Sequence, residues 1–338
     1  MALSHLVGSM NLDSADATFR MVSETIGDQI ARVPDGETTT KRWLSVQGPR
    51  MNVNPALTPA SSENKMFSEM PAWQLREGVD ARDVVFDFGY AERAEGSYPI
   101  FREMKESGAI APEVRFQVGL PTPIAIGILI ARRDQRALLP AIERALFGEI
   151  DRIARTIPLE ELAIQWEVAI EIAALQGLLQ VVPDTEEMLD QLVRVADGVP
   201  ASAEVGFHLC FGDSPPRDGG AGERFAQADL GLLVDIASRI TAARRPIQWL
   251  HMPVPIDRED DAYFEPLERL NTGPGTTLFL GLIHEEDGVE GAQRRIAAAA
   301  RHRRDFGVAT ECGMGRKPTN SIRRLLEIHR DAVVPDET

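Results

Sequence analysis

Short apolar runs recur along the chain, and they constrain its fold more than any other feature. Eight of them, each five to eight residues long, lie at residues 3–7, 29–33, 114–120, 162–167, 203–210, 246–252, 278–284 and 307–312. Most are followed by a stretch with helical spacing of apolar residues, clearest at 138–153 and 289–300. Near-continuous apolar strands that alternate with helices are typical of parallel sheets covered by helices. The sequence therefore predicts an α/β fold, a closed (β/α)8 barrel of the TIM type, as one domain over residues 1–338.

Residues 38–112 break this alternation between the second and third strands. The segment is rich in Pro, Ser and Met and lacks a clean period. Its apolar side chains, which need a surface to bury them, are Met51, Met66, Phe67, Met70 and Trp73. Because loops of this length usually have a function of their own, we expect a long insertion that closes over the pocket as a lid or forms the interface of a homo-oligomer.

Charge and composition exclude several classes of partner. The formal net charge is −16, so nucleic acid and anionic membrane surfaces would be repelled. No apolar run is long enough to span a bilayer and no leader pattern is visible, so we expect a cytoplasmic protein. Two cysteines give no disulfide framework, and in a reducing compartment metal binding or catalysis is their more frequent use.

The two cysteines and one histidine stand at predicted strand ends. His208 and Cys210 are two residues apart, so their side chains point to the same side of the strand. Cys312 ends the last run, and the carboxyl ends of barrel strands meet at one rim. One histidine and two cysteines are three zinc ligands, which leave a fourth position open, as in catalytic sites. The alternative is that both cysteines are reduced core residues.

Further polar residues fall at the same predicted rim. Glu37 follows the second run, Glu167 ends the fourth, and His251 and His284 stand near the ends of the sixth and seventh. Each has a structural alternative when taken alone, for example a hydrogen-bonded pocket wall for His251 or an ion pair for Glu37. Their joint position at one end of the barrel predicts a shared site.

Several motifs together resemble a known family. They are Gly8-Ser9, Gly36-Glu37, Gln165-Trp-Glu-Val-Ala169, His208-Leu-Cys210, Gly281-Leu-Ile-His284 and Cys312-Gly313. Over most of its length the chain resembles the C-terminal catalytic barrel of cobalamin-independent methionine synthase and its shorter relatives, which include the epoxyalkane:coenzyme M transferases. The resemblance implies that His208, Cys210 and Cys312 bind zinc. It also implies that Glu37 and Glu167 bind substrate and that His284 is an acid/base residue.

The chain departs from the family pattern at two places. The family has a glutamate zinc ligand near the end of strand six, where this chain reads Ile247-Gln-Trp-Leu-His-Met252. His251 could replace that glutamate as a fourth ligand, or it could lie behind the ligands. The family's acidic pair at strand four is reduced to Glu167, with Trp166 beside it as a predicted wall of the substrate pocket.

These features lead to a functional hypothesis. Zinc would activate a small thiol as a zinc-bound thiolate, which attacks an electrophilic carbon of a methyl or alkyl donor while His284 protonates the leaving group. The expected class is a zinc-dependent methyltransferase or alkyltransferase. A zinc-dependent hydrolase or lyase, a metal-free enzyme like the uroporphyrinogen decarboxylases, and a binding protein without chemistry remain open.

Overall fold

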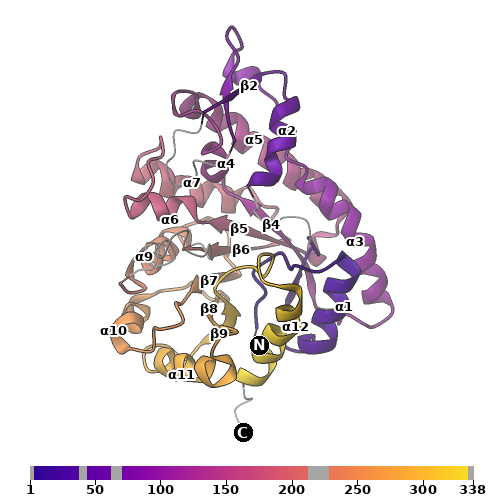
Figure 1. The fold of residues 1–338 in the computed structure, drawn as a ribbon, viewed down its shortest axis with the longest axis vertical. Helices are drawn as coiled ribbons and strands as arrows, with labels where there is room; N and C mark the ends of the chain where they lie inside the picture. The colour runs from indigo at the N-terminus through magenta and orange to yellow at the C-terminus, as the bar shows by residue number, and fades with distance from the viewer. Residues whose placement is uncertain (1–3, 38–43, 62–70, 212–227, 334–338) are drawn as a thin grey trace.

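The chain is described by a computed structural model that covers residues 4–37, 44–61, 71–211 and 228–333. Its centre is a curled parallel sheet with helices around it (Figure 1). Seven strands follow one another in the order β1 (Arg32–Pro34), β4 (Arg115–Pro121), β5 (Leu162–Val168), β6 (Glu204–Leu209), β7 (Trp249–Pro253), β8 (Thr277–Ile283) and β9 (Phe306–Thr310). Every neighbouring pair is parallel. The predicted strand–helix alternation is confirmed.

The N-terminal segment joins the two edges of this sheet. Ser4 forms parallel bridges with Ile30, just before β1, and with Val308 on β9. The Ser4 N–H donates to the Gln29 carbonyl at 3.0 Å, and the His5 N–H donates to the Val308 carbonyl at 2.9 Å. The predicted barrel is therefore confirmed, with the segment at Ser4 and His5 in the place of the eighth strand. The strand expected at residues 3–7 is reduced to one bridging residue, Ser4, and residue 3 lies outside the described residues.

The outer helices alternate with the strands as the apolar spacing predicts. The long ones are α1 (Ala15–Ile26), α3 (Tyr90–Glu106), α5 (Arg132–Thr156), α7 (Thr185–Asp197), α9 (Gly231–Ile240), α11 (Gly288–Ala300) and α12 (Thr319–Ala332). The short helices are α2 (Gly48–Val53), α4 (Pro123–Gly127), α6 (Ile170–Leu175) and α10 (Asp261–Phe264), and 3-10 turns occupy η1 (Ser45–Gln47), η3 (Ala81–Asp83), η4 (Leu159–Glu161) and η5 (Glu265–Arg269). Side-chain caps fix several starts, such as the capping box of Asp184 and Glu187 on α7. Among the residues that the structure describes, no helix combines the length and apolarity needed to cross a lipid bilayer.

Alternation along the strands separates two apolar layers. On β5, Leu162, Ile164 and Trp166 belong to the large core between the sheet and the helices. Ala163 belongs to a second, small cluster that it shares with residues of the N-terminal segment, β7, β8 and β9, namely Val7, Trp249, Phe279 and Ala309. Successive side chains of a strand point to opposite faces, so this small cluster fills the barrel interior.

The insertion at 38–112 contains an outer barrel helix and a hairpin. Helix α3 packs against α1, α5 and β4, and strands β2 (Leu57–Ala60) and β3 (Ala72–Leu75) form an antiparallel pair at the far end of the molecule (Figure 1). Trp73 is buried, and its backbone hydrogen-bonds to Leu129 and Ala131 beyond α4. Met66, Phe67 and Met70 lie outside the described residues. The role of this segment as a lid or a subunit interface stays a prediction.

A buried carboxyl on α6 gives a testable pH dependence. Glu171 is fully buried, and burial raises its pKa from 4.5 to about 7, while the Thr122 hydroxyl partly opposes that shift. A pKa that is raised in the folded state means that the folded protein binds the proton more tightly, so stability falls as pH rises from about 4.5 through 7. We expect Glu171→Gln to be more stable than the parent by about 3 kcal/mol at pH 8 and nearly equal at pH 4.5.

Urea denaturation at both pH values checks this prediction. Glu103→Gln, at an exposed position of α3, is the matched control and should show no such pH-dependent difference. Equal stability of Glu171→Gln and the parent at pH 8 would contradict the assigned pKa.

Candidate metal centre

Three sulfur and nitrogen donors meet where β6 and β9 end. His208 lies on β6, and Cys210 follows that strand, with its N–H donating to the Val168 carbonyl at 2.8 Å so that parallel pairing with β5 continues. Cys312 follows β9, in a turn closed by the Thr310 hydroxyl, which donates to the Cys312 carbonyl at 2.7 Å. One donor atom from each of His208, Cys210 and Cys312 lies within 4.8 Å of the other two. The structure thus brings together the three residues that the sequence singles out first.

The geometry and chemistry of these donors fit zinc. The two Sγ atoms are 3.7 Å apart, and two sulfur ligands at about 2.3 Å from a tetrahedral zinc ion would lie about 3.8 Å apart. His208 Nε2 is buried and has no hydrogen-bond partner among the residues that the structure describes. The contact with Cys210, together with burial, raises the pKa of the Cys312 thiol well above its usual range. Both thiols can ionise together only when a cation compensates their charge.

His251 contacts this cluster through His208. It pairs with His208 across β6 and β7, and the two Nδ1 atoms are 2.6 Å apart. Both rings are fully buried, and burial lowers the pKa of His251 to about 3 and that of His208 well below 6.5. Both imidazoles are therefore neutral near pH 7. His251 is not among the three residues whose donor atoms lie within 4.8 Å of one another.

Glu167, near the end of β5, faces the cluster from one side. Its Oε2 is 3.9 Å from His208 Nε2, and its Oε1 accepts a hydrogen bond of 2.7 Å from Gln165 Nε2. Gln165 is itself fixed in the barrel interior, because its Oε1 accepts from the His5 ring at 2.8 Å and from Trp249 Nε1 at 3.1 Å. Burial raises the pKa of Glu167 to about 8. A carboxyl in this state can both donate and accept a hydrogen bond.

Glu37 stands at a tight turn after β1. Gly36 has φ of +75°, and a Cβ there would meet the Ala15 Cα at 2.6 Å, so only glycine fits this turn. Glu37 Oε1 is 3.1 Å from Arg93 Nη1 of α3. These two side chains and Asp35 line a cavity of about 240 Å³. Burial, with the Glu37 charge, raises the pKa of Asp35 to about 7.

His284 follows β8 and contacts a carboxyl that precedes Cys312. Its Nε2 donates to the Val254 carbonyl at 2.9 Å, which leaves Nδ1 as the acceptor of the neutral ring. Nδ1 lies 3.6 Å from Glu311 Oε2. Burial and the Arg295 charge lower the pKa of His284 to about 4, and burial raises that of Glu311 to about 7. The acid/base role of His284 stays a prediction.

Trp166 is not brought to the cluster. It lies between Gln165 and Glu167 on β5 and therefore faces the outer core, where it is fully buried. Sequence reasoning also missed four neighbours of the site, namely Asp35, Arg93, Glu311 and Arg316, whose Nη2 lies 3.7 Å from Cys312 Sγ. Only Asp35 carried a sequence signal, as part of the turn before Glu37. The others reach the site through tertiary contacts.

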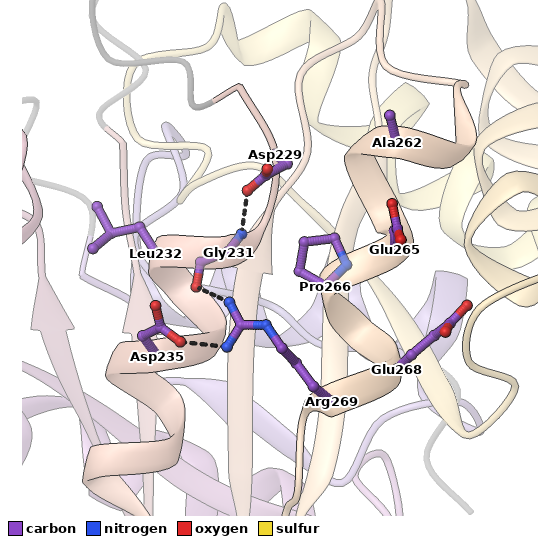
Figure 2. A pocket seen from close by; sticks show the side chains of 9 residues that line it. All are labelled: Asp229, Gly231, Leu232, Asp235, Ala262, Glu265, Pro266, Glu268 and Arg269. Atoms are coloured by element: carbon purple, nitrogen blue, oxygen red, sulfur yellow. Dashed lines mark hydrogen bonds and ion pairs between the residues drawn. The ribbon is translucent and has the colours of Figure 1, made fainter.

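A larger groove lies elsewhere on the surface. Its volume is about 610 Å³, and it runs between α9 and the α10–η5 segment (Figure 2). Arg269 pairs there with Asp235 and donates to the Gly231 carbonyl at 3.2 Å. None of the residues that line this groove belongs to the His208, Cys210 and Cys312 cluster. The groove is an acidic surface feature separate from the candidate centre.

Comparison with known proteins finds similar folds among solved structures. Neither a family model nor a curated protein sequence matches the chain. A B12-independent methionine synthase from Shewanella sp. W3-18-1, in complex with selenomethionine, aligns with a TM-score of 0.61 at 13% identity over 94% of this chain and 86% of that one. A putative vitamin-B12 independent methionine synthase from Listeria monocytogenes aligns with a TM-score of 0.52 at 13% identity over 95% and 87%. A methyltransferase from Methanosarcina mazei aligns with a TM-score of 0.50 at 13% identity over 96% and 94%.

This likeness establishes the fold. The chain shares the barrel of cobalamin-independent methionine synthase-like proteins along nearly its whole length, which agrees with the resemblance inferred from its motifs. Activity is a separate question, because one barrel fold hosts many chemistries.

Proposed function

We propose that this protein is a zinc-dependent methyl- or alkyltransferase that uses a small thiol as the acceptor. The observation that carries the proposal is the cluster of His208, Cys210 and Cys312, with sulfur atoms 3.7 Å apart, at the carboxyl end of a barrel. The fold is shared with methionine synthase-like proteins and a methyltransferase. Three protein ligands leave one position of a tetrahedral ion open.

The chain's own side chains have separate roles in this proposal. His208, Cys210 and Cys312 would hold the zinc ion, which when bound lowers the pKa of a small thiol so that the thiol is nucleophilic at neutral pH. Glu167, whose Oε2 faces His208, and Glu37, on the same rim, would hold a cationic or hydroxyl-bearing part of a substrate. A sulfur–carbon bond forms as the bond from carbon to the leaving group breaks. His284 Nδ1 would accept the proton that the thiol loses and then donate it to the leaving group.

A hydrolase or lyase in the same pocket is the second candidate. The carboxyls of Glu167 and Glu311, with pKa values raised by burial to about 8 and about 7, are suited to proton transfer near neutral pH. Such an enzyme would turn over without any thiol. A metal-free decarboxylase-like enzyme would turn over without zinc.

The test combines metal analysis with a thiol panel. Protein purified without chelator should hold about one zinc per chain, as a single ligand set requires. Methyl or alkyl transfer should then depend on both zinc and an added thiol. Thiol-independent turnover of a zinc-loaded protein would favour the hydrolase or lyase, and turnover that survives full zinc removal would rule out both zinc mechanisms.

Glu37 and Glu167 give a prediction for substrate binding. Replacing either with glutamine removes a charge or a carboxyl proton but keeps the size of the side chain. We expect kcat/KM to fall about 10- to 100-fold, the usual effect of one lost hydrogen bond to a charged group. Zinc content should stay at about one per chain, because neither residue is among the three donors.

Steady-state kinetics and metal analysis of the same preparations check this prediction. Glu103→Gln, exposed on α3, serves again as the control for a charge change of the same kind. Unchanged kinetics together with lower stability in Glu37→Gln would show instead that the ion pair with Arg93 is purely structural.

A further inference from the structure

The contact between His208 and His251 requires one shared hydrogen. The two rings are buried on neighbouring strands, with centroids 4.7 Å apart and planes at 41°. The contact joins Nδ1 to Nδ1 at 2.6 Å, so one ring must donate and the other must accept. Two tautomer arrangements satisfy it: either His208 carries the hydrogen on Nδ1, or His251 does.

Only one arrangement leaves His208 able to bind a metal ion. If His251 donated, the neutral His208 ring would carry its hydrogen on Nε2, and this nitrogen would have no lone pair to offer. If His208 donates from Nδ1, its Nε2 keeps a lone pair. The Nε2 atoms of both rings are buried without a hydrogen-bond partner among the described residues, but only His208 is grouped with Cys210 and Cys312, so a metal ion would be the partner of His208 Nε2. His251 then carries its own hydrogen on Nε2, with the Thr310 backbone of β9 beside its ring.

We infer that His251 is a positioning residue that accepts the Nδ1 hydrogen of His208 and thereby fixes the tautomer and ring orientation of a zinc ligand. The inference rests on the proposed zinc site and removes His251 from the ligand set. A histidine that ligates a metal usually donates its other ring N–H to an acceptor, which is usually a carboxylate, a carbonyl or water. In this chain the acceptor is a second imidazole.

The surrounding barrel interior holds His251 in place. His208 lies opposite His251, and Gly206 lies opposite Trp249, in the same β6–β7 register. A Cβ on Gly206 would meet the Trp249 ring at 2.0 Å, so the indole packs directly on the backbone of β6. On the other side, the His5 ring lies 6.0 Å from the His251 ring and stacks on Phe279. This packing leaves the His251 ring little freedom to turn toward the sulfur atoms.

Two substitutions of His251 and a direct count of ligands test the inference. His251→Phe keeps a ring but removes the acceptor, whereas His251→Gln keeps an acceptor oxygen. Zinc affinity, measured by competition with a chelator, should fall about 10- to 100-fold in His251→Phe, and His251→Gln should recover part of that loss. X-ray absorption should find one imidazole and two sulfur ligands in both the parent and His251→Phe.

A second buried histidine provides the control. His329 on α12 is fully buried and donates from Nδ1 to the Leu325 carbonyl at 2.8 Å. It is not one of the three grouped donors, so His329→Asn should leave zinc affinity unchanged. Two imidazole ligands in the parent and one in His251→Phe would show that His251 is a ligand. That result would overturn this inference but leave the proposed function intact. Unchanged zinc affinity in His251→Phe would also overturn this inference. A parent protein that binds no zinc would overturn the proposed function as well. The ligand count of the parent decides the question even if His251→Phe does not fold.

Discussion

Replacing either cysteine with serine is expected to remove zinc from the protein. Cys210→Ser and Cys312→Ser each take away one of three donors, and a serine hydroxyl does not ionise to replace a thiolate ligand at neutral pH. The remaining histidine and cysteine cannot hold the ion against dialysis. Zinc content should fall from about one per chain to near zero, as a single site requires, and thiol-dependent transfer should be lost with it.

The two cysteine variants check each other, because the chain has no third cysteine. Metal analysis after dialysis gives zinc content, and circular dichroism with thermal unfolding shows whether the barrel remains. An ion that binds the folded state stabilises it. Added zinc should therefore raise the Tm of the parent, and it should not raise the Tm of variants that have lost the site. A folded Cys210→Ser or Cys312→Ser protein that keeps one zinc would show that this cysteine is an ordinary core residue.

Arg295→Met is expected to have the largest effect on stability. Arg295 on α11 is fully buried and forms a bidentate pair with Asp287, with distances of 2.6 and 2.9 Å. It also donates to the carbonyls of Leu282 at 3.0 Å and Ile256 at 2.8 Å. Its loss leaves the partly buried Asp287 carboxylate with the more distant Arg294, whose Nη2 is 3.7 Å from Oδ2, and takes the donor away from two carbonyls. The free energy of unfolding at pH 7 should fall by about 3–5 kcal/mol.

The same pair has a predicted pH dependence. The hydrogen bonds from Arg295 lower the pKa of Asp287 below 3.8. A lowered pKa contributes stability above the unfolded value, and that contribution is lost as pH falls through the folded value. The parent should therefore lose its advantage over Arg295→Met as the pH drops below about 4.

Arg294→Met is the control for this substitution. Arg294 is the neighbouring residue on α11, and its side chain is 53% exposed. It pairs with Glu259 at 2.9 Å and lies farther from Asp287, at 3.7 Å. An exposed pair of this kind contributes less than about 1 kcal/mol. Urea unfolding of both variants at pH 7 gives the comparison. Equal free energies of unfolding for Arg295→Met and Arg294→Met would show that the Arg295–Asp287 pair does not stabilise the segment between β8 and α11, which includes His284.

The sequence predicts the barrel and the three-donor cluster for the same physical reason. Apolar runs separated by helical stretches leave few folds that can bury both faces of the sheet, and the barrel places all strand ends on one rim. The spacing of His208 and Cys210 then determines that both face inward. The length of the first strand could not be predicted, because it depends on which backbone groups of β1 and β9 remain free at closure.

The position of Trp166 shows where residue type can mislead. Its flanking residues, Gln165 and Glu167, are polar and point into the barrel, so alternation alone places Trp166 outside. The ion pair of Glu37 with Arg93 and the contact of His284 with Glu311 could not be predicted in the same way. Each joins parts of the chain whose distance in space depends on helix packing and turn geometry.

X-ray absorption at the zinc edge, with and without a small thiol, tests the central claim most directly. The free protein should show one imidazole and two sulfur ligands, with the remaining position filled by a light atom such as water oxygen. Addition of the thiol acceptor should increase the sulfur count by one and displace that light atom. A sulfur count that stays at two in the presence of a thiol that supports turnover would contradict thiol activation at this centre.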